Sequence, residues 1–298
     1  MTTIISTPIE TIVRGCTLTE APRWRDGRLY FSDMFAHRIC AVDEAGRLET
    51  IIETSDKPSG LGFMPNGDLL FVLMKSAKVM RLGSGGLTQH ADLTPFADAD
   101  MNDMVVGPTG RAYVGQMGFH FEGGGERKTT TLVVIEPDGT ARVAADKLWG
   151  PNGIVLSPDG RTLITAEAAG NKIAAFDVAA DGGLSNYRIF AVPPEDNAPD
   201  GICMDSEGGI WAGLPVGLKA PAPGMFGLGF VRMEEGGRAT HLIPIPAGRR
   251  AIACCFGGSD RKSLYLCTVD SFSRDEVLAS RGGRIERVKT DFTGAGTP

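Results

Sequence analysis

Apolar and polar residues alternate along this chain in short runs separated by turns, a pattern that predicts β-strands throughout. Six stretches share one layout: a short polar or proline lead, an alternating strand, a tight turn and a second apolar strand. They span residues 19–33, 58–74, 101–117, 151–167, 199–214 and 250–268. The chain is therefore built from internal repeats.

The spacing of the turns indicates the architecture. The turn glycines Gly27, Gly67, Gly110, Gly160 and Gly208 recur at intervals of roughly 40 to 50 residues, the length of a four-stranded propeller blade. Further hairpins between the repeats, at residues 37–52, 130–145 and 171–191, would supply outer strands. No segment shows a sustained helical period.

Six such units account for nearly all of the 298 residues. The sequence therefore predicts an all-β fold, a six-bladed β-propeller with four-stranded blades, as a single domain over residues 1–298. Two isolated strands, at residues 10–15 and 283–292, flank the repeats. We expect them to pair within one blade and close the ring.

The net charge and the composition of the chain limit the classes of molecule that it can bind. A net charge of −6 argues against nucleic acid and against an anionic membrane, because both are held by clustered Lys and Arg. The N-terminal residues lack a basic segment followed by an apolar one, and no window approaches the roughly 18 apolar residues of a membrane span. We expect a soluble, cytoplasmic protein with a small-molecule substrate, as a monomer or weak homodimer.

The six cysteines match neither a metal knuckle nor a secreted disulfide framework, and most lie in apolar runs. We expect buried free thiols.

Aligning the repeats gives a column of residues at the start of each inner strand, where the strands face the central channel. The column reads Glu20, Ser59, Asn102, Asn152, Asp200 and Ala251. Two carboxylates and two carboxamides, with no Lys, His or Cys among them, are the donors preferred by a hard cation, so Ca²⁺ is the first expectation. Mg²⁺ and Mn²⁺ also suit such a ring, and Zn²⁺ is less natural there. The alternative is that these residues only cap turns.

Four motifs carry a resemblance to a known family. They are "EAPRW" around Glu20, "NDMVV" at Asn102, "GPNGI" around Asn152 and "PDGIC" around Asp200. In this order they resemble the metal-binding signatures of the senescence-marker-protein/gluconolactonase/luciferin-regenerating-enzyme family of six-bladed propellers. The resemblance implies one divalent metal held by Glu20, Asn152 and Asp200, with Asn102 as a further ligand or a substrate contact. It also implies lactone hydrolysis as the most frequent activity.

One position departs from the family pattern. Members that act on sugar lactones carry an arginine two residues before the Asn–Asp pair, and this chain has Asp100 there. The loops at the channel mouth are rich in apolar residues. Those expected near the mouth are Met34, Phe35, Met117, Phe119, Phe121, Trp149, Met225 and Phe226. We therefore expect a hydrophobic or aromatic lactone rather than a sugar lactone, with Asn102, His37, Met117, His120 and Trp149 as substrate contacts.

The expected mechanism is Lewis-acid activation of a lactone carbonyl with attack by a water that the metal or a carboxylate activates. Asp200 or Asp103 would be the general base; Asp103 reaches the channel only if its strand begins irregularly. Two alternatives stay open: another metal-assisted hydrolysis or ring opening, of an ester, phosphoester or fluorophosphate, and a calcium-binding propeller without enzymatic activity.

Overall fold

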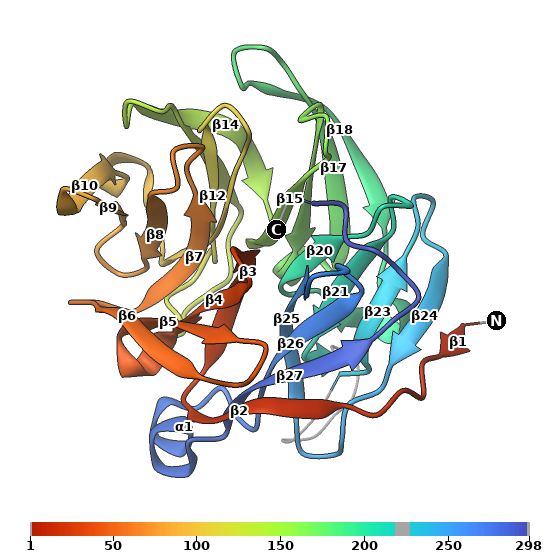
Figure 1. Cartoon of the computed structure of the whole chain (residues 1–298). Helices are drawn as coiled ribbons and strands as arrows, with labels where there is room; N and C mark the ends of the chain where they lie inside the picture. The colour runs from red at the N-terminus through yellow and green to blue at the C-terminus, as the bar shows by residue number, and fades with distance from the viewer. Residues whose placement is uncertain (1, 218–226, 297–298) are drawn as a thin grey trace.

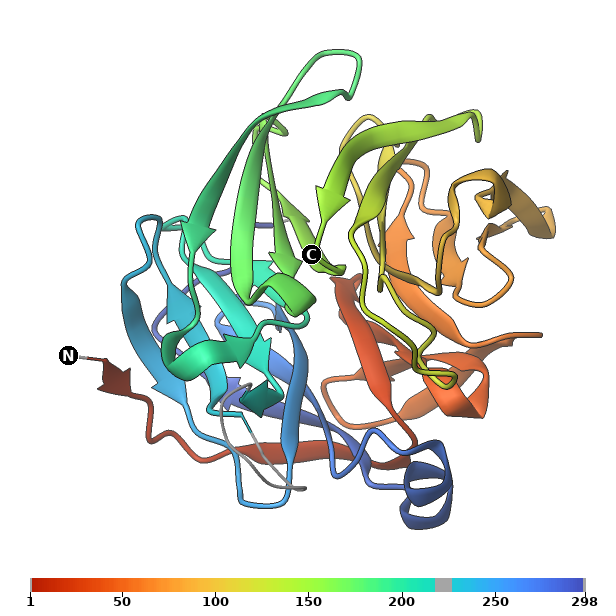
Figure 2. The same ribbon diagram turned by 180° about the vertical axis from the view of Figure 1, so that it is seen from behind.

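The computed structural model describes residues 2–217 and 227–296, and its strands form six blades around a central axis (Figure 1). Figure 2 shows the same ring from behind. The prediction of an all-β propeller with six four-stranded blades is confirmed.

The first three blades follow one another along the chain, each with its inner strand first in sequence. Blade 1 comprises β3 (Thr19–Arg25), β4 (Arg28–Asp33), β5 (Arg38–Asp43) and β6 (Leu48–Glu53). Blade 2 comprises β7 (Pro58–Phe63), β8 (Leu69–Leu73), β9 (Lys78–Gly83) and β10 (Gly86–Asp92). Blade 3 comprises β11 (Met101–Val106), β12 (Ala112–Gln116), β13 (Thr130–Ile135) and β14 (Ala141–Leu148).

The remaining blades complete the ring. Blade 4 comprises β15 (Pro151–Leu156), β16 (Thr162–Glu167), β17 (Lys172–Val178) and β18 (Leu184–Ala191). Blade 5 comprises β20 (Ile202–Met204), β21 (Ile210–Leu214), β23 (Gly229–Met233) and β24 (Ala239–Ile243), with β1 (Thr3–Ile4) parallel to β24 as a fifth strand. Blade 6 comprises β25 (Arg250–Gly257), β26 (Ser263–Val269), β27 (Gly283–Lys289) and β2 (Glu10–Cys16).

The ring closes where the two ends of the chain meet. Strand β2 pairs antiparallel with β27, with Glu10 opposite Arg287 and Cys16 opposite Gly283. The predicted pairing of the flanking strands is thus confirmed. The prediction that five glycines occupy turns is also confirmed, because all five have a positive φ, which favours glycine.

A few short elements lie outside the blades. The two-residue strands β19 (Asn197–Ala198) and β22 (Val216–Gly217) pair with each other, and the helix α1 (Arg274–Ser280) joins β26 to β27. The 3₁₀ turns are η1 (Met34–Ala36), η2 (Thr94–Phe96), η3 (Ala168–Gly170) and η4 (Pro194–Asp196). A helix of seven residues is too short to show a sustained period in the sequence.

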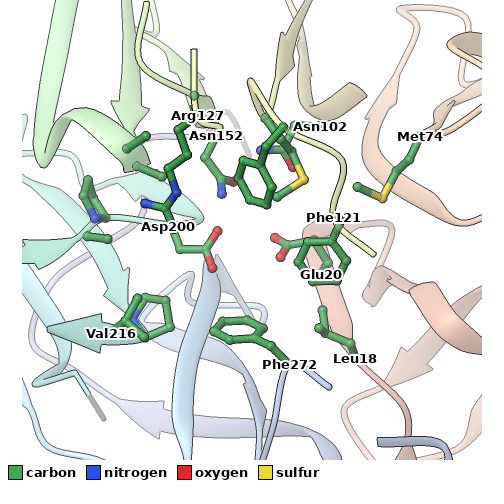
Figure 3. A pocket seen from close by; sticks show the side chains of 18 of the residues that line it. Leu18, Glu20, Met74, Asn102, Phe121, Arg127, Asn152, Asp200, Val216 and Phe272 are labelled. Atoms are coloured by element: carbon green, nitrogen blue, oxygen red, sulfur yellow. The ribbon is translucent and has the colours of Figure 1, made fainter. Parts of the chain in front are cut away.

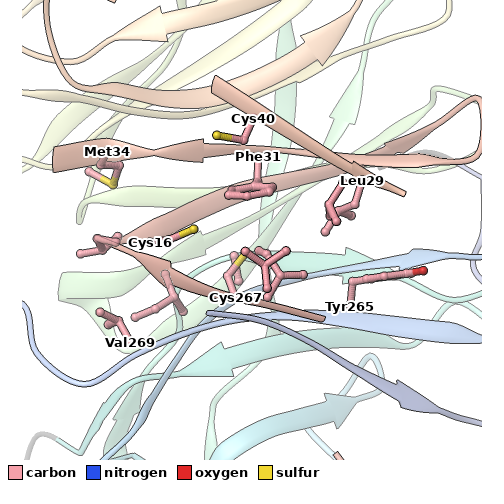
Figure 4. Close-up of a cluster of buried hydrophobic side chains, with 14 of the residues drawn as sticks. Cys16, Leu29, Phe31, Met34, Cys40, Tyr265, Cys267 and Val269 are labelled. Carbon is pink, nitrogen blue, oxygen red and sulfur yellow. The ribbon is translucent and has the colours of Figure 1, made fainter. Parts of the chain in front are cut away.

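Apolar side chains fill the spaces between neighbouring blades. One such cluster joins blade 1 to blade 6, where Leu29 and Phe31 pack with Tyr265 and Cys267 (Figure 4). All six cysteines are buried and free, as expected. Burial raises the pKa of the Cys40 thiol to about 11 and that of Cys255 to about 12. Within the described residues, no helix is long and apolar enough to cross a membrane.

Candidate metal centre

Four side chains of the predicted column line one cavity at the centre of the ring. Glu20, Asn102, Asn152 and Asp200 border a cavity of about 330 Å³ and are each only 6–8% exposed. Figure 3 shows the Glu20 and Asp200 carboxylates projecting into the open space from opposite sides. The first three residues stand on β3, β11 and β15, and Asp200 lies two residues before the start of β20.

Irregular strand starts expose these side chains. The pairing register shifts between Glu20 and Arg23 in β3, between Met101 and Met104 in β11, and between Pro151 and Ile154 in β15. At such a bulge, successive side chains no longer alternate regularly between the two faces of the sheet. The column residues therefore point along the channel instead of into the spaces between blades.

Two glycines bring blades 4, 5 and 6 close together beside the ligand column. The Gly153 backbone N–H donates to the Asp200 carbonyl at 3.2 Å, and that of Gly201 donates to the Ile252 carbonyl at 2.9 Å. A Cβ on Gly153 would lie 2.4 Å from the Ile202 nitrogen, which no side chain tolerates. The Asn–Gly and Asp–Gly pairs in the sequence thus combine a polar side chain with a close backbone approach.

Burial makes the two carboxylates electrostatically unfavourable without a counter-ion. Burial, and then the neighbouring Asp200 and Asp103, raise the pKa of Glu20 well above its ordinary value. Burial raises the pKa of Asp200 to about 8, with Asp103 adding to it and a hydrogen bond from Asn152 opposing it. A bound cation would remove this cost.

The donor set fits an oxygen-liganded divalent cation. The side-chain oxygen of Asn152 is buried and has no hydrogen-bond partner, which is a costly state for a polar atom that binds nothing. In the described parts of the chain no three His, Cys, Asp or Glu side chains gather as a metal cluster, so the ring depends on carboxamide oxygens. Two carboxylates and two amides match the preference of Ca²⁺ and leave Zn²⁺ without its usual ligands.

The other two members of the column have different surroundings. The Ser59 hydroxyl donates to the Asn102 backbone carbonyl at 2.6 Å and so supports a neighbouring column residue. Ala251 is fully buried and has no polar side-chain atom. Four of the six column positions therefore present oxygen to the cavity.

Asp103 is close enough to raise the pKa of Glu20 and Asp200, but it does not line the cavity. Its carboxylate forms a buried salt bridge with Arg23 at 2.9 Å, and Arg23 also donates to the Met104 carbonyl. Burial raises the pKa of Asp103, against the effect of Arg23. The irregular start of β11 does not bring Asp103 into the wall of the cavity, so only Asp200 of the two expected bases lies there.

Some of the expected substrate contacts line the cavity and others do not. Met117 lines the cavity together with Asn102. His37 lies in an exposed left-handed turn after η1, and His120 is 66% exposed, with its Nδ1 2.9 Å from the Asp100 carboxylate. Trp149 borders a separate groove beside Tyr187. Among the described residues, then, Met117 and Asn102 are the expected contacts that the structure brings to the cavity.

The apolar mouth is present in the structure. Met34, Phe119 and Phe121 line the cavity as expected, whereas Phe35 packs into the core between blades 1 and 6. Met225 and Phe226 lie outside the described residues. Sequence reasoning did not find Met74, Arg127 or Phe272, which also line the cavity. Arg127 and Phe272 belong to no repeat, and Met74 ends the second repeat, away from the aligned column, so the alignment does not place them in the cavity.

Comparisons with known proteins agree with the geometry. The family model described as SMP-30/Gluconolactonase/LRE-like region matches residues 18–270. The chain is 24% identical over 266 residues to regucalcin of Gallus gallus, covering 87% of this chain and 85% of the relative. It is 25% identical over 291 residues to pentonolactonase XacC of Haloferax volcanii, covering 94% and 93%.

Solved structures show the same fold. A calcium-binding protein, regucalcin, from Agrobacterium tumefaciens superposes with a TM-score of 0.77 at 19% identity, covering 100% of this chain and 99% of the other. A gluconolactonase from Xanthomonas campestris gives 0.72 at 21% identity, covering 98% and 90%. With the family model spanning most of its length, this chain belongs to the SMP-30/gluconolactonase/LRE-like family.

Proposed function

We propose that the protein is a metal-dependent hydrolase that opens a hydrophobic or aromatic lactone. The observation that carries the proposal is the cavity itself, where a ring of buried oxygens lies beneath walls built from Phe and Met. A structural cation would need only the ring. An apolar space beside it is what a small-molecule substrate requires. The lactonase names of two similar proteins support the reaction class.

Glu20, Asn152 and Asp200 would hold the cation, with Asn102 as a further ligand or a contact to the substrate, and Ca²⁺ is the proposed ion. When bound, such a cation supplies a Lewis acid that polarises the lactone carbonyl and stabilises the charge that develops on its oxygen. Asn152 has a free oxygen for this ion, and its amide donates to Asp200, so it orients both.

The remaining residues position the substrate and the attacking water. Phe121, Phe119 and Phe272 pack against the apolar body of the lactone and exclude bulk water. Asp200 is the carboxylate at the cavity wall that we assign as acceptor for the proton of the water that attacks the carbonyl. Asp103 forms a salt bridge with Arg23. We assign this pair the role of balancing the charges next to the four oxygen-bearing residues.

The choice against a sugar lactone rests on Asp100. Where sugar lactonases of the family carry an arginine, this buried carboxylate accepts a hydrogen bond from the Phe121 backbone at 3.1 Å and contacts His120. It therefore holds an aromatic side chain at the cavity wall and leaves no arginine at that position to bind a polyol. An apolar wall offers few partners for sugar hydroxyls.

The test is a panel of sugar, aliphatic and aromatic lactones, followed by proton release with chelator-treated protein. Each lactone is assayed without metal and with Ca²⁺, Mn²⁺, Mg²⁺ or Zn²⁺. We expect metal-dependent opening, with aromatic and aliphatic lactones preferred to sugar lactones. Tight metal binding without turnover of any lactone would overturn the proposal and favour a calcium-binding propeller or another electrophile such as an ester or phosphoester.

A further inference from the structure

A segment of blade 3 reaches over the cavity and is held there at several points. We call residues 117–128 the flap. Its base is closed by hydrogen bonds from the Met117 N–H to the Asp100 carbonyl at 2.9 Å and from the Lys128 N–H to the Gly118 carbonyl at 3.1 Å. Asp100 also binds His120 and the Phe121 N–H through its side chain. The flap therefore has a defined position at the cavity edge.

A second anchor lies on the outer side of the flap. Glu122 forms ion pairs with Lys57, which is almost fully buried, and with Arg274 of α1 at 3.2 Å. Blade 2 and the helix after β26 thus hold the flap from two directions. Phe121 is in ring contact with Phe35 and with Phe272, so its place at the cavity wall is fixed by packing as well.

One charged side chain of the flap lines the cavity, at its solvent-exposed mouth. Arg127 is the single Lys or Arg among the described lining residues, and Figure 3 shows its side chain extending toward the open space on the side of Asp200. Its guanidinium carbon lies 5.4 Å from the centre of the Phe119 ring. No carboxylate of the described chain pairs with it, unlike the neighbouring Lys128, whose Nζ is 3.8 Å from Asp98.

The positive charge of Arg127 is therefore not neutralised by a carboxylate of the described chain. The charges of Glu20 and Asp200 would be balanced by a divalent cation, so Arg127 would remain as an unpaired cation at the cavity wall. A planar guanidinium binds a carboxylate with two parallel hydrogen bonds, which is a specific and strong form of recognition. The aromatic walls beside it accommodate an apolar body.

We propose that Arg127 binds a carboxylate on the substrate, so that the site takes lactones with an apolar or aromatic body and an anionic group away from the reacting carbonyl. The inference rests on the proposed lactone hydrolysis and adds the substrate class to it. Arg127 lies on the flap, at a position unrelated to the arginine that Asp100 replaces.

The test uses three matched lactones. They are γ-phenyl-γ-butyrolactone, the same lactone with a carboxylate on its phenyl ring, and the methyl ester of that carboxylate. Turnover is measured with Ca²⁺ for the wild type, Arg127→Gln, Arg127→Lys and the control Lys128→Gln, which removes a charge from the same flap outside the cavity. We expect the wild type to favour the carboxylate over its ester by about 10- to 100-fold in kcat/KM. Arg127→Gln should bring this ratio close to one, Arg127→Lys should keep part of it, and Lys128→Gln should keep all of it.

A binding measurement separates this inference from the proposed reaction. The lactam analogue of the carboxylate is not hydrolysed, and its affinity for the Ca²⁺-loaded protein is measured by calorimetry. A loss of about tenfold or more in Arg127→Gln but not in Lys128→Gln supports the carboxylate site, even if no lactone is opened, in which case hydrolysis alone is overturned. Equal affinities for the acid and ester analogues, or equal losses in both variants, would overturn the inference while lactone turnover stands or falls separately.

Discussion

At the scale of single residues, the most informative feature is the pair of buried carboxylates, Glu20 and Asp200. Natural proteins rarely bury a charge without a partner, because desolvation costs several kcal/mol per ion. Here burial raises the pKa of both groups; repulsion from Asp200 and Asp103 raises that of Glu20 further, and repulsion from Asp103 raises that of Asp200 further. This uncompensated state supports the proposal that the two residues bind a cation, since by themselves they do not stabilise the fold.

Asp200→Asn should therefore stabilise the metal-free protein and remove its response to Ca²⁺. The folded-state pKa of about 8 lies above the ordinary value, so the unfolded chain binds fewer protons between roughly pH 4 and 8. The stability of the metal-free wild type consequently falls as pH rises through this window, and the fall should be smaller in Asp200→Asn. Thermal unfolding at several pH values, with chelator and with Ca²⁺, measures both effects.

Asp98→Asn is the control for this experiment, because Asp98 is exposed and lies outside the cavity. It should leave the Ca²⁺ response unchanged. An equal upward shift of Tm by Ca²⁺ in the wild type and in Asp200→Asn would contradict the assignment of Asp200 as a ligand.

That Glu20, Asn102, Asn152 and Asp200 share one cavity could be predicted from sequence because the repeats place them in one register. Asn152 is unremarkable alone, since asparagine commonly caps turns, and it becomes informative only when aligned with Glu20, Asn102 and Asp200. Asp103 shows the limit of this reasoning. Its neighbour Asn102 faces the cavity, but the partner that determines its own direction is Arg23, eighty residues earlier in the chain.

Among the strands and turns, the close approach of blades 4 and 5 depends on Gly153, the residue after Asn152. A methyl group on Gly153 would meet the Ile202 nitrogen at 2.4 Å and the Asp200 carbonyl oxygen at 2.6 Å. These contacts are with backbone atoms, which cannot move aside as a flexible side chain would. Blades 4 and 5 would have to separate, and the Asn152 and Asp200 side chains would separate with them.

Gly153→Ala should therefore destabilise the protein by about 2 kcal/mol or more and weaken Ca²⁺ binding. Gly85→Ala is the matched control, because its added methyl group would meet no atom within 4 Å. Chemical denaturation and calorimetric Ca²⁺ titration of the two variants provide the comparison. Wild-type stability in Gly153→Ala would show that the close approach of the two strands is not required.

Strand pairing was predictable where a pattern spans the element. Alternation and turn glycines identified the hairpins, and the two flanking strands identified the closure of blade 6. The addition of β1 to blade 5 and the presence of α1 were not predicted. Two paired residues and seven helical residues are too short to leave a periodic signal, and tertiary contacts determine their structure.

In the molecule as a whole, the propeller brings polar side chains from four distant repeats together in one central cavity. The repeat length predicts the ring, and the ring predicts a shared height for the column. The path of the flap does not follow from any repeat, since long-range anchors at Asp100 and Lys57 fix it. For this reason the four oxygen-bearing residues of the column could be placed together from sequence, whereas Arg127, Met74 and Phe272 emerged only from the structure.

Metal-dependent hydrolysis can be tested by following lactone turnover while Ca²⁺ is added stepwise to chelator-treated protein, in parallel with calorimetry. We expect turnover to rise in proportion to bound Ca²⁺ and to saturate at one ion per chain. Asn152→Ala should lose both the binding and the turnover, whereas Asp98→Asn, which changes an exposed carboxylate outside the cavity, should keep both. Full turnover in the presence of chelator, or unchanged turnover in Asn152→Ala, would contradict the account.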